Sequence, residues 1–343
     1  MKTIFATIAA ATLFSAPVQA GTIWDAMSLT GSQRLYIYAL SQPGMGKKEH
    51  AVRAKILGNM GFVGHVGQVS SSALKFHPVL RYDNNVNGGF PTDSVTVGSM
   101  TFVLNPKDVR VSGVLMGAGL DGGFAMPLAN GLALSTQVSA EYAMDFEHGL
   151  AKGRASGQVC LNKMANPSTW LDACAQTWYS EYDLGSSTGY GVSVAAHKDF
   201  MMGKSINEVT VQLRGTHNGG SGIDGYNQQL ASVRLTSALS SGVALFGGVD
   251  VGTKVDGYQV MRERAVFGIS GRIGGKISSV SLSAQNDRGG MWLGQARHDR
   301  TYALTVTQQI TKKLTLSASL TRTKSSADVY DGTVYGLNAR FAF

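Results

Sequence analysis

Fourteen segments of this chain alternate between apolar and polar residues, and this alternation limits the folds open to it. In the last segment the odd positions from Tyr335 to Phe343 are apolar or aromatic, while the even positions include Asn338 and Arg340. A period of two with one apolar face indicates β-strands. The predicted strands are 74–83, 112–127, 132–146, 151–164, 170–183, 187–200, 207–216, 229–239, 243–253, 263–273, 277–286, 301–310, 313–323 and 333–343.

The connectors between these strands alternate between short and long. Short ones lie near 128–131, 165–168, 202–205, 240–242, 274–276 and 309–312, and the intervening ones are longer. Short turns at one end and long loops at the other are typical of outer-membrane barrels, whose short turns are periplasmic. An even count of 14 brings both ends of the barrel to the periplasm, so the strand-like segment 95–103 is assigned to the long first loop, 84–111.

The polar face of the strands, rich in Ser, Thr, Gln and Arg, suits a wide, wet lumen better than the single core of a soluble β-sandwich. A closed barrel also satisfies every backbone group, as a lipid environment requires. We therefore predict an all-β protein, a transmembrane antiparallel β-barrel of about 14 strands, in the outer membrane of a Gram-negative bacterium.

The chain is predicted to divide into three parts. Residues 1–20 combine Lys2, an apolar run over 4–15 and the small-x-small site Val18-Gln19-Ala20, which indicate a secretory signal peptide. Residues 21–70 contain two predicted helices, 33–41 and 47–60, and either plug the lumen, lie beneath it or form a loosely packed leader. Residues 71–343 form the barrel.

Composition agrees with an exported barrel. Only 15% of the residues are charged, Gly is abundant at 43 residues, and the net charge is +8. After the signal segment no apolar run approaches 18 residues, so helical membrane spans are not predicted. A basic balance is also found in nucleic-acid binders, but here Lys and Arg would line the pore or face anionic lipid. No nucleic-acid partner is predicted.

Cys160 and Cys174 are the two cysteines of the chain. They flank the turn at Asn166-Pro167-Ser168 symmetrically, so that in a hairpin they would face each other. In the oxidising periplasm a disulfide would form. It would close a loop of about 15 residues and stabilise the folded state by roughly 3 kcal/mol. The alternative is two free thiols.

The seven histidines show no metalloprotease or zinc spacing, so no metal, cofactor or catalytic residue is predicted. His148, His217 and His298 fall near outer loops with Asp145, Glu147, Asp224 and Asp299 close in sequence. An outer-rim hydrolase would place Asp, His and Ser there, but spacing alone cannot define such a site. Solvated loop residues are the better interpretation, and we do not predict an enzyme.

Charged residues predicted to face the lumen are mostly positive. The arginines are Arg214, Arg234, Arg264, Arg272 and Arg340, against Glu208, Asp250 and few others. A cationic lumen favours anions. Alternatively, these arginines pair with local carboxylates and water across a filled lumen.

The stretch 77–89 reads HPVLRYDNNVNGG and resembles the P-x-x-x-Y-D-S-N-x-N opening of the barrel in surface lipoprotein assembly modifier (Slam) proteins. The stretch 124–131, FAMPLANG, is similar to the family's Y-x-x-P-L-S-D-x periplasmic turn. The resemblance implies a 14-stranded barrel over 73–343. The motif residues carried over are Tyr82, Asp83, Asn84, Asn85, Asn87, Gly88 and Gly89.

The resemblance has one clear departure. Slam proteins carry a periplasmic tetratricopeptide domain, and each such repeat takes 34 residues. Residues 21–70 hold barely one helical pair, so most of a client-receiving domain is missing and lipoprotein export is only weakly implied.

Two functions follow as expectations. The first is a Slam-like barrel that assists the passage of a surface lipoprotein or another polypeptide through the lumen or through a lateral opening between the first and last strands. The alternative is a passive, porin-like channel with a mild preference for anions. The expected partners are outer-membrane lipid, a possible lipoprotein client, and the barrel assembly machinery, which would recognise the C-terminal signal of Phe341 and Phe343.

Overall fold

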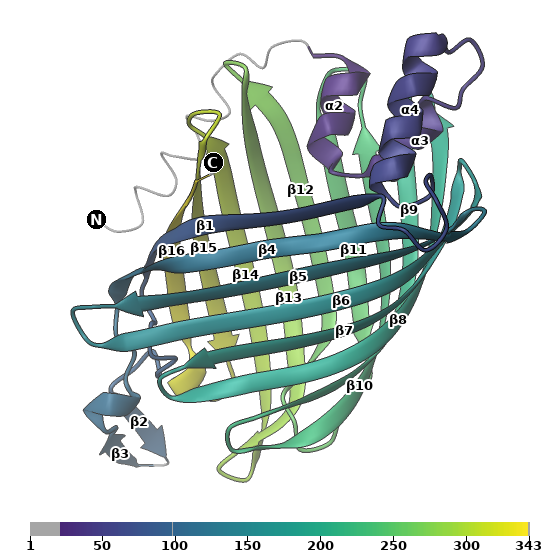
Figure 1. Cartoon of the computed structure of the whole chain (residues 1–343). Coiled ribbons are helices and arrows are strands. Elements are labelled where there is room, and N and C mark those ends of the chain that lie inside the picture. Colours follow the sequence, from purple (N-terminus) through teal and green to yellow (C-terminus); the bar gives the residue numbers. More distant parts are fainter. Residues whose placement is uncertain (1–20, 98, 342–343) are drawn as a thin grey trace.

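The computed structural model describes residues 21–97 and 99–341 and contains a closed antiparallel barrel of fourteen strands. Each strand pairs with its neighbours in sequence, and β1 (Ser71–Asp83) closes the ring against β16 (Gly332–Phe341) (Figure 1). The predicted strand count and fold class are confirmed. The predicted signal peptide, 1–20, and Phe343 lie outside the described residues.

The other wall strands follow in chain order between these two. They are β4 (Gly113–Ala129), β5 (Leu132–Asp145), β6 (Leu150–Asn166), β7 (Thr169–Tyr182), β8 (Gly185–Met202), β9 (Ser205–Gly220), β10 (Ile223–Ala238), β11 (Ala244–Gly252), β12 (Val260–Ile273), β13 (Lys276–Trp292), β14 (Gln295–Gln309) and β15 (Leu314–Ser325).

The segment 95–103 lies outside the wall, as predicted, but it forms two strands. In the long first loop β2 (Ser94–Val97) pairs with β3 (Met100–Val103) in a separate two-stranded sheet. The short 3-10 helices η1 (Pro106–Asp108) and η2 (Asp328–Tyr330) lie in the first and last loops of this end of the barrel. We call this the outer end and the opposite one the periplasmic end.

Several predicted outer loops are instead strand. The segments 217–227 and 286–299 were expected to be loops. In the structure β9 ends only at Gly220 and β10 begins at Ile223. Likewise, β13 ends at Trp292 and β14 begins at Gln295. The alternation fades there because side chains outside the lipid layer need not be apolar. The backbone ladder nevertheless continues, since it depends on main-chain hydrogen bonds and not on side-chain type.

The two faces of the wall differ as the alternation predicts. Large apolar side chains such as Phe76, Val192 and Leu213 are 71%, 65% and 58% exposed on the outer face. Polar residues between them, among them Gln212 and Arg214, face the lumen. An apolar exterior over a polar interior is the arrangement of a barrel that spans a bilayer.

Three helices precede the barrel: α2 (Ile23–Thr30), α3 (Gln33–Ala39) and α4 (Lys47–Asn59). Figure 1 shows them gathered at the periplasmic end, where α2 contacts β10, β11 and β12 and α3 contacts β8 and β9. Two of the helices were predicted, and α2 was missed. Among the described residues, no helix is long and apolar enough to span a membrane.

Candidate functional site

The lumen-facing side chains at the periplasmic end hold helix α3 against the wall. Arg34 of α3 places its Nε 3.0 Å from Glu208 Oε2 on β9 and its Nη1 3.4 Å from Asp172 Oδ2 on β7. Ser32, which caps the helix, donates its hydroxyl to Glu208 Oε2 at 2.7 Å. Burial opposes the charge of Arg34, but Glu208 and Asp172 hold the pKa of the guanidinium above its ordinary value. We call these residues, together with His197 of β8, the helix dock.

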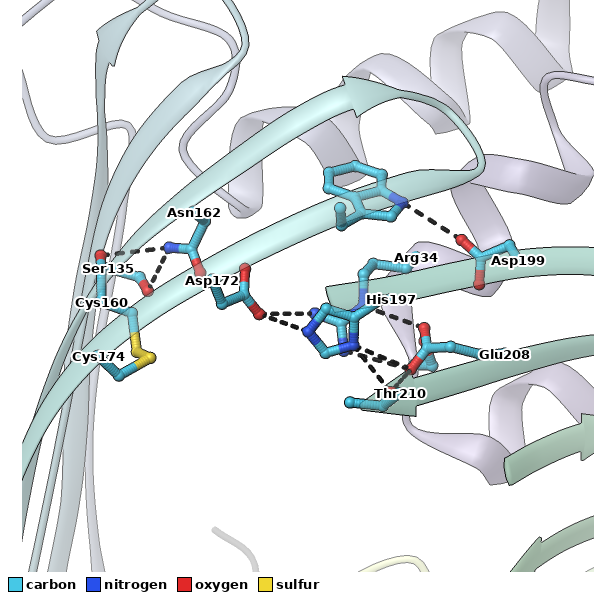
Figure 2. Close-up of polar contacts among 12 residues, drawn as sticks. Arg34, Ser135, Cys160, Asn162, Asp172, Cys174, His197, Asp199, Glu208 and Thr210 are labelled. Atoms are coloured by element: carbon cyan, nitrogen blue, oxygen red, sulfur yellow. Dashed lines mark hydrogen bonds and ion pairs between the residues drawn. A yellow bond between two sulfur atoms is a disulfide. The ribbon is translucent and has the colours of Figure 1, made fainter. Parts of the chain in front are cut away.

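His197 connects the two carboxylates of the helix dock (Figure 2). Its Nε2 lies 2.8 Å from Asp172 Oδ2, and its Nδ1 lies 2.8 Å from the hydroxyl of Thr210 and 3.8 Å from Glu208 Oε1. The imidazole is 6% exposed. A buried network in which each charge has a partner fixes the position of α3 relative to three strands.

Apolar contacts complete the attachment of the helices. Met27 of α2 and Leu35 of α3 are fully buried with Ile206 and Ala238 of the wall. Trp170, in a second cluster with Ile37 and Leu57, donates its indole N–H to Asp199 at 3.2 Å. Helices α2 and α3 and the C-terminal end of α4 therefore pack against the barrel wall at the periplasmic mouth.

Cys160 and Cys174 face each other on β6 and β7 and are joined by a disulfide. Both line one cavity together with Arg34, Asp172 and His197, so the bridge braces the wall next to the helix dock (Figure 2).

The predicted motif after the first strand anchors the first loop at the outer end. The Asn87 amide oxygen accepts from the backbone N–H groups of Gly89 and Val111, and its amide nitrogen donates to the carbonyls of Val109 and Lys107. Gly88 has a φ of +78° and lies where a Cβ would overlap the ring of Tyr182. Only glycine combines this conformation with that close approach.

Other residues of the motif reach neighbouring strands. Lys152 of β6 donates to Asp83 Oδ2 at 2.8 Å and to the carbonyl of Asn85. Tyr82 stacks on Tyr335 of β16, with ring centroids 5.9 Å apart. The motif thus ties the first loop to β6 and β16 at the outer rim.

Asn84 extends the junction between β1 and β16, which we call the seam. In the seam ladder Val79–Asp83 pairs with Gly336–Arg340, whereas β1 pairs with β4 over its whole length. Beyond the ladder the Asn84 side chain accepts from the Tyr335 N–H at 3.0 Å and donates to the Thr333 carbonyl at 3.2 Å. The Asn84 side chain thus makes the two hydrogen bonds to β16 that the backbone of one more paired β1 residue would make.

The first group of lumen arginines lies on β1, β6 and β16. Arg81 Nη1 and Arg154 Nη2 contact the same carboxylate, Glu141 of β5, at 3.0 and 2.6 Å. Arg340 Nη2 contacts Asp121 of β4 at 2.9 Å. We call these three arginines and two carboxylates the first arginine group.

The second arginine group lies on the opposite part of the ring. Arg234 of β10 and Arg264 of β12 both contact Asp250 of β11, at 2.6 and 2.7 Å. Arg214 of β9 bonds Gln212 and makes no ion pair with a described residue. The predicted arginines are thus partly paired, as one alternative held, yet the two groups together contain six arginines and three carboxylates.

The remaining predicted positions have simpler surroundings. Arg272 lies 3.7 Å from Asp25 of α2, beside the helices. Phe341 is the last described residue of β16 and pairs with Leu314 of β15. At the outer rim, His148 Nδ1 bonds Asp145 Oδ2 at 2.6 Å, and His217 stacks on Tyr190 and bonds Asn227.

Sequence reasoning missed Arg34, Asp172, His197, Arg81 and Arg154. All but Arg34 occupy lumen-facing positions of predicted strands. The alternation along each strand could therefore have identified them as lumen residues. Arg34 lies on a helix whose docking face cannot be read from its own periodicity.

Large cavities open along the lumen. One of about 1050 Å³ extends from the helices past β4 to β7, and one of about 470 Å³ adjoins the first arginine group. A closed antiparallel barrel with an apolar exterior is the form in which β-structure crosses a bilayer, and bacterial examples lie in the outer membrane. The chain is an outer-membrane β-barrel of a Gram-negative bacterium.

No family model and no curated protein sequence matches this chain. Among solved structures, OccAB3 of Acinetobacter baumannii is similar, with a TM-score of 0.42 and 9% identity over 80% of this chain and 99% of that one. OprB of Pseudomonas putida has a TM-score of 0.45 and 9% identity, covering 86% of this chain and 97% of that one. A BenF-like porin of Pseudomonas fluorescens has a TM-score of 0.44 and 6% identity, covering 81% of this chain and 99% of that one. Similarity this remote transfers neither a solute nor a mechanism.

Proposed function

We propose that this protein is a porin-like channel that lets small hydrophilic solutes diffuse across the outer membrane, with a preference for anions. The observation that carries the proposal is the excess positive charge of the two arginine groups on the lumen wall. Six arginines of the two arginine groups face only three carboxylates, Glu141, Asp121 and Asp250. A pore lined by excess positive charge lowers the energy of anions relative to cations.

The acidic residues of the helix dock do not cancel this excess. Glu208 and Asp172 have 6% and 15% of their side chains exposed, and both contact Arg34. Charges that are buried and paired act weakly on an ion in the lumen. Arg154, Arg264 and Arg340 expose 63%, 41% and 66% of their side chains, so a passing solute can reach them.

Planar-bilayer recording of the purified full-length barrel tests the proposal. We expect a steady conductance. Under a KCl gradient, the sign of the reversal potential should show that chloride permeates more readily than potassium. The double variant Arg234→Gln/Arg264→Gln should shift this potential toward cations. Arg322→Gln, which removes a charge outside the lumen, should leave it unchanged. A cation-selective or non-conducting wild-type barrel would contradict the proposal.

The alternative remains Slam-like assistance to a lipoprotein or another polypeptide, which the motif 77–89 suggests. It predicts little steady conductance and the loss of a surface lipoprotein when the gene is deleted, with solute permeability unchanged. Measuring both properties in one deletion strain separates the two functions.

A further inference from the structure

We infer that the lumen contains a binding site for an acidic sugar, a hydroxylated ring that carries a carboxylate or phosphate, at Trp178 beside Arg154 and Arg340. The inference deepens the proposed channel function and rests on it, because a solute must enter the lumen to reach this site. Three features of the 470 Å³ cavity carry it: an aromatic surface, exposed guanidinium groups and unpaired polar side chains.

The aromatic surface is the indole of Trp178. Trp178 of β7 lies directly opposite Gly189 of β8, and a Cβ at Gly189 would overlap the six-membered ring. The indole therefore lies across the neighbouring strand, occupying the space that a side chain there would fill. Trp178 also lines both large lumen cavities, so its ring is accessible from the pore. A flat aromatic surface in a cavity packs against the apolar face of a sugar ring.

Two arginines supply the charge. Arg154 and Arg340 line the same cavity, and each uses its Nη2 for a carboxylate, Glu141 or Asp121. A guanidinium has five N–H donors, so each side chain, about two-thirds exposed, keeps donors for a ligand. The planar fork matches a carboxylate or phosphate. Glu141 is 9% exposed and lies between two arginines, so it offers little attraction to a cation.

Polar side chains for the sugar hydroxyls are also present. Ser156, Ser180 and Asn338 line the cavity, and their side chains make no hydrogen bond to another described residue. The hydroxyls and the amide can both donate and accept. A neutral sugar would leave the two guanidinium groups unused, and an acyclic acid would leave the indole unused. A ring that bears both hydroxyls and an acidic group uses all three features.

Isothermal titration calorimetry on the detergent-solubilised full chain tests the site independently of conduction. The probes are a hexuronate, glucose 6-phosphate, glucose as the neutral ring and gluconate as the open-chain acid. We expect the hexuronate or glucose 6-phosphate to bind at least about tenfold more tightly than glucose and gluconate, a difference of roughly 1.4 kcal/mol. Whichever of the two binds more tightly identifies the preferred acidic group.

Variants assign the binding to these residues. Trp178→Ala and Arg340→Gln should each weaken binding about tenfold, Trp178→Phe should retain most of it, and Arg322→Gln should leave it unchanged. Heat-modifiable migration on a gel verifies that each barrel is folded. Wild-type affinity in folded Trp178→Ala, equal binding of glucose and the hexuronate, or no binding of any probe would overturn the inference. Binding by a barrel that does not conduct would overturn the channel proposal alone.

Discussion

The helix dock and the first arginine group use the same residue types on the same inner wall but have opposite surroundings. In the helix dock one arginine, Arg34, meets two carboxylates, and the network is covered by α3. In the first arginine group three arginines meet two carboxylates, and Arg154 and Arg340 extend into open space. The first arrangement positions a helix, and the second presents charge to a solute.

This difference follows from solvation. Breaking a covered ion pair leaves a charge without water or partner, which costs several kcal/mol. An exposed pair is screened, and its loss costs about 1 kcal/mol or less. The wall can therefore carry excess arginine in the lumen at little cost to stability, whereas the helix dock requires each of its charges to be paired.

The largest effect is expected for Arg34→Ala. This variant removes the guanidinium that Glu208 and Asp172 share and leaves His197 as the remaining basic group beside them. It should lower the free energy of unfolding by about 3 kcal/mol. Urea titration in detergent measures the loss, and limited proteolysis should show earlier cleavage within residues 21–60. Arg340→Ala is the matched control, with an expected loss of about 1 kcal/mol or less. Equal losses in the two variants would remove the distinction between the regions.

A similar loss is expected when the bridge beside the helix dock is removed. The double variant Cys160→Ala/Cys174→Ala should lower the free energy of unfolding by up to about 3 kcal/mol, because the unfolded chain gains the freedom of the opened loop. Urea titration of the wild type with and without reductant should reproduce the difference. Coincident transitions for the oxidised and reduced protein would show that the bridge does not brace this wall.

A smaller loss is expected for Asn84→Ala, which tests whether a polar contact at the outer end also serves as an anchor. The variant leaves the Tyr335 N–H without its partner and removes one of two donors to the Thr333 carbonyl, the other being Arg110. It should lower the free energy of unfolding by about 2 kcal/mol. Asn338→Ala is the control, since its side-chain amide bonds no described residue. If both variants unfold at the same urea concentration, Asn84 does not stabilise the seam.

The smallest effect is expected for Asp250→Asn in the second arginine group. Loss of this carboxylate should raise the anion-to-cation permeability ratio about twofold, since a unit charge some 10 Å from a permeating ion in water contributes roughly 0.4 kcal/mol. Reversal potentials under a salt gradient measure it. A shift toward cations would mean that Arg234 and Arg264 do not act on the permeating ion.

The missed helix α2 had signals in the sequence. Thr22 and Asp25 form a capping box, in which Asp25 accepts from the Thr22 N–H at 2.9 Å, and Gly31 ends the helix. The Thr22 N–H and hydroxyl hold the pKa of Asp25 below its usual range. A residue of Ser or Thr followed three positions later by an acidic residue is a recognisable helix start, so this omission could have been avoided.

By itself the sequence determined the barrel, its fourteen strands and the inward or outward parity of Arg214, Arg234, Arg264 and Arg340. It could do so because lipid on one side and water on the other impose a period of two on every strand. Only the tertiary structure decided which carboxylate meets which arginine, that Arg34 reaches β7 and β9, and that Trp178 lies over Gly189. These contacts depend on strand register and on the docking of a helix, and register is set by the whole closed ring, which no local pattern records.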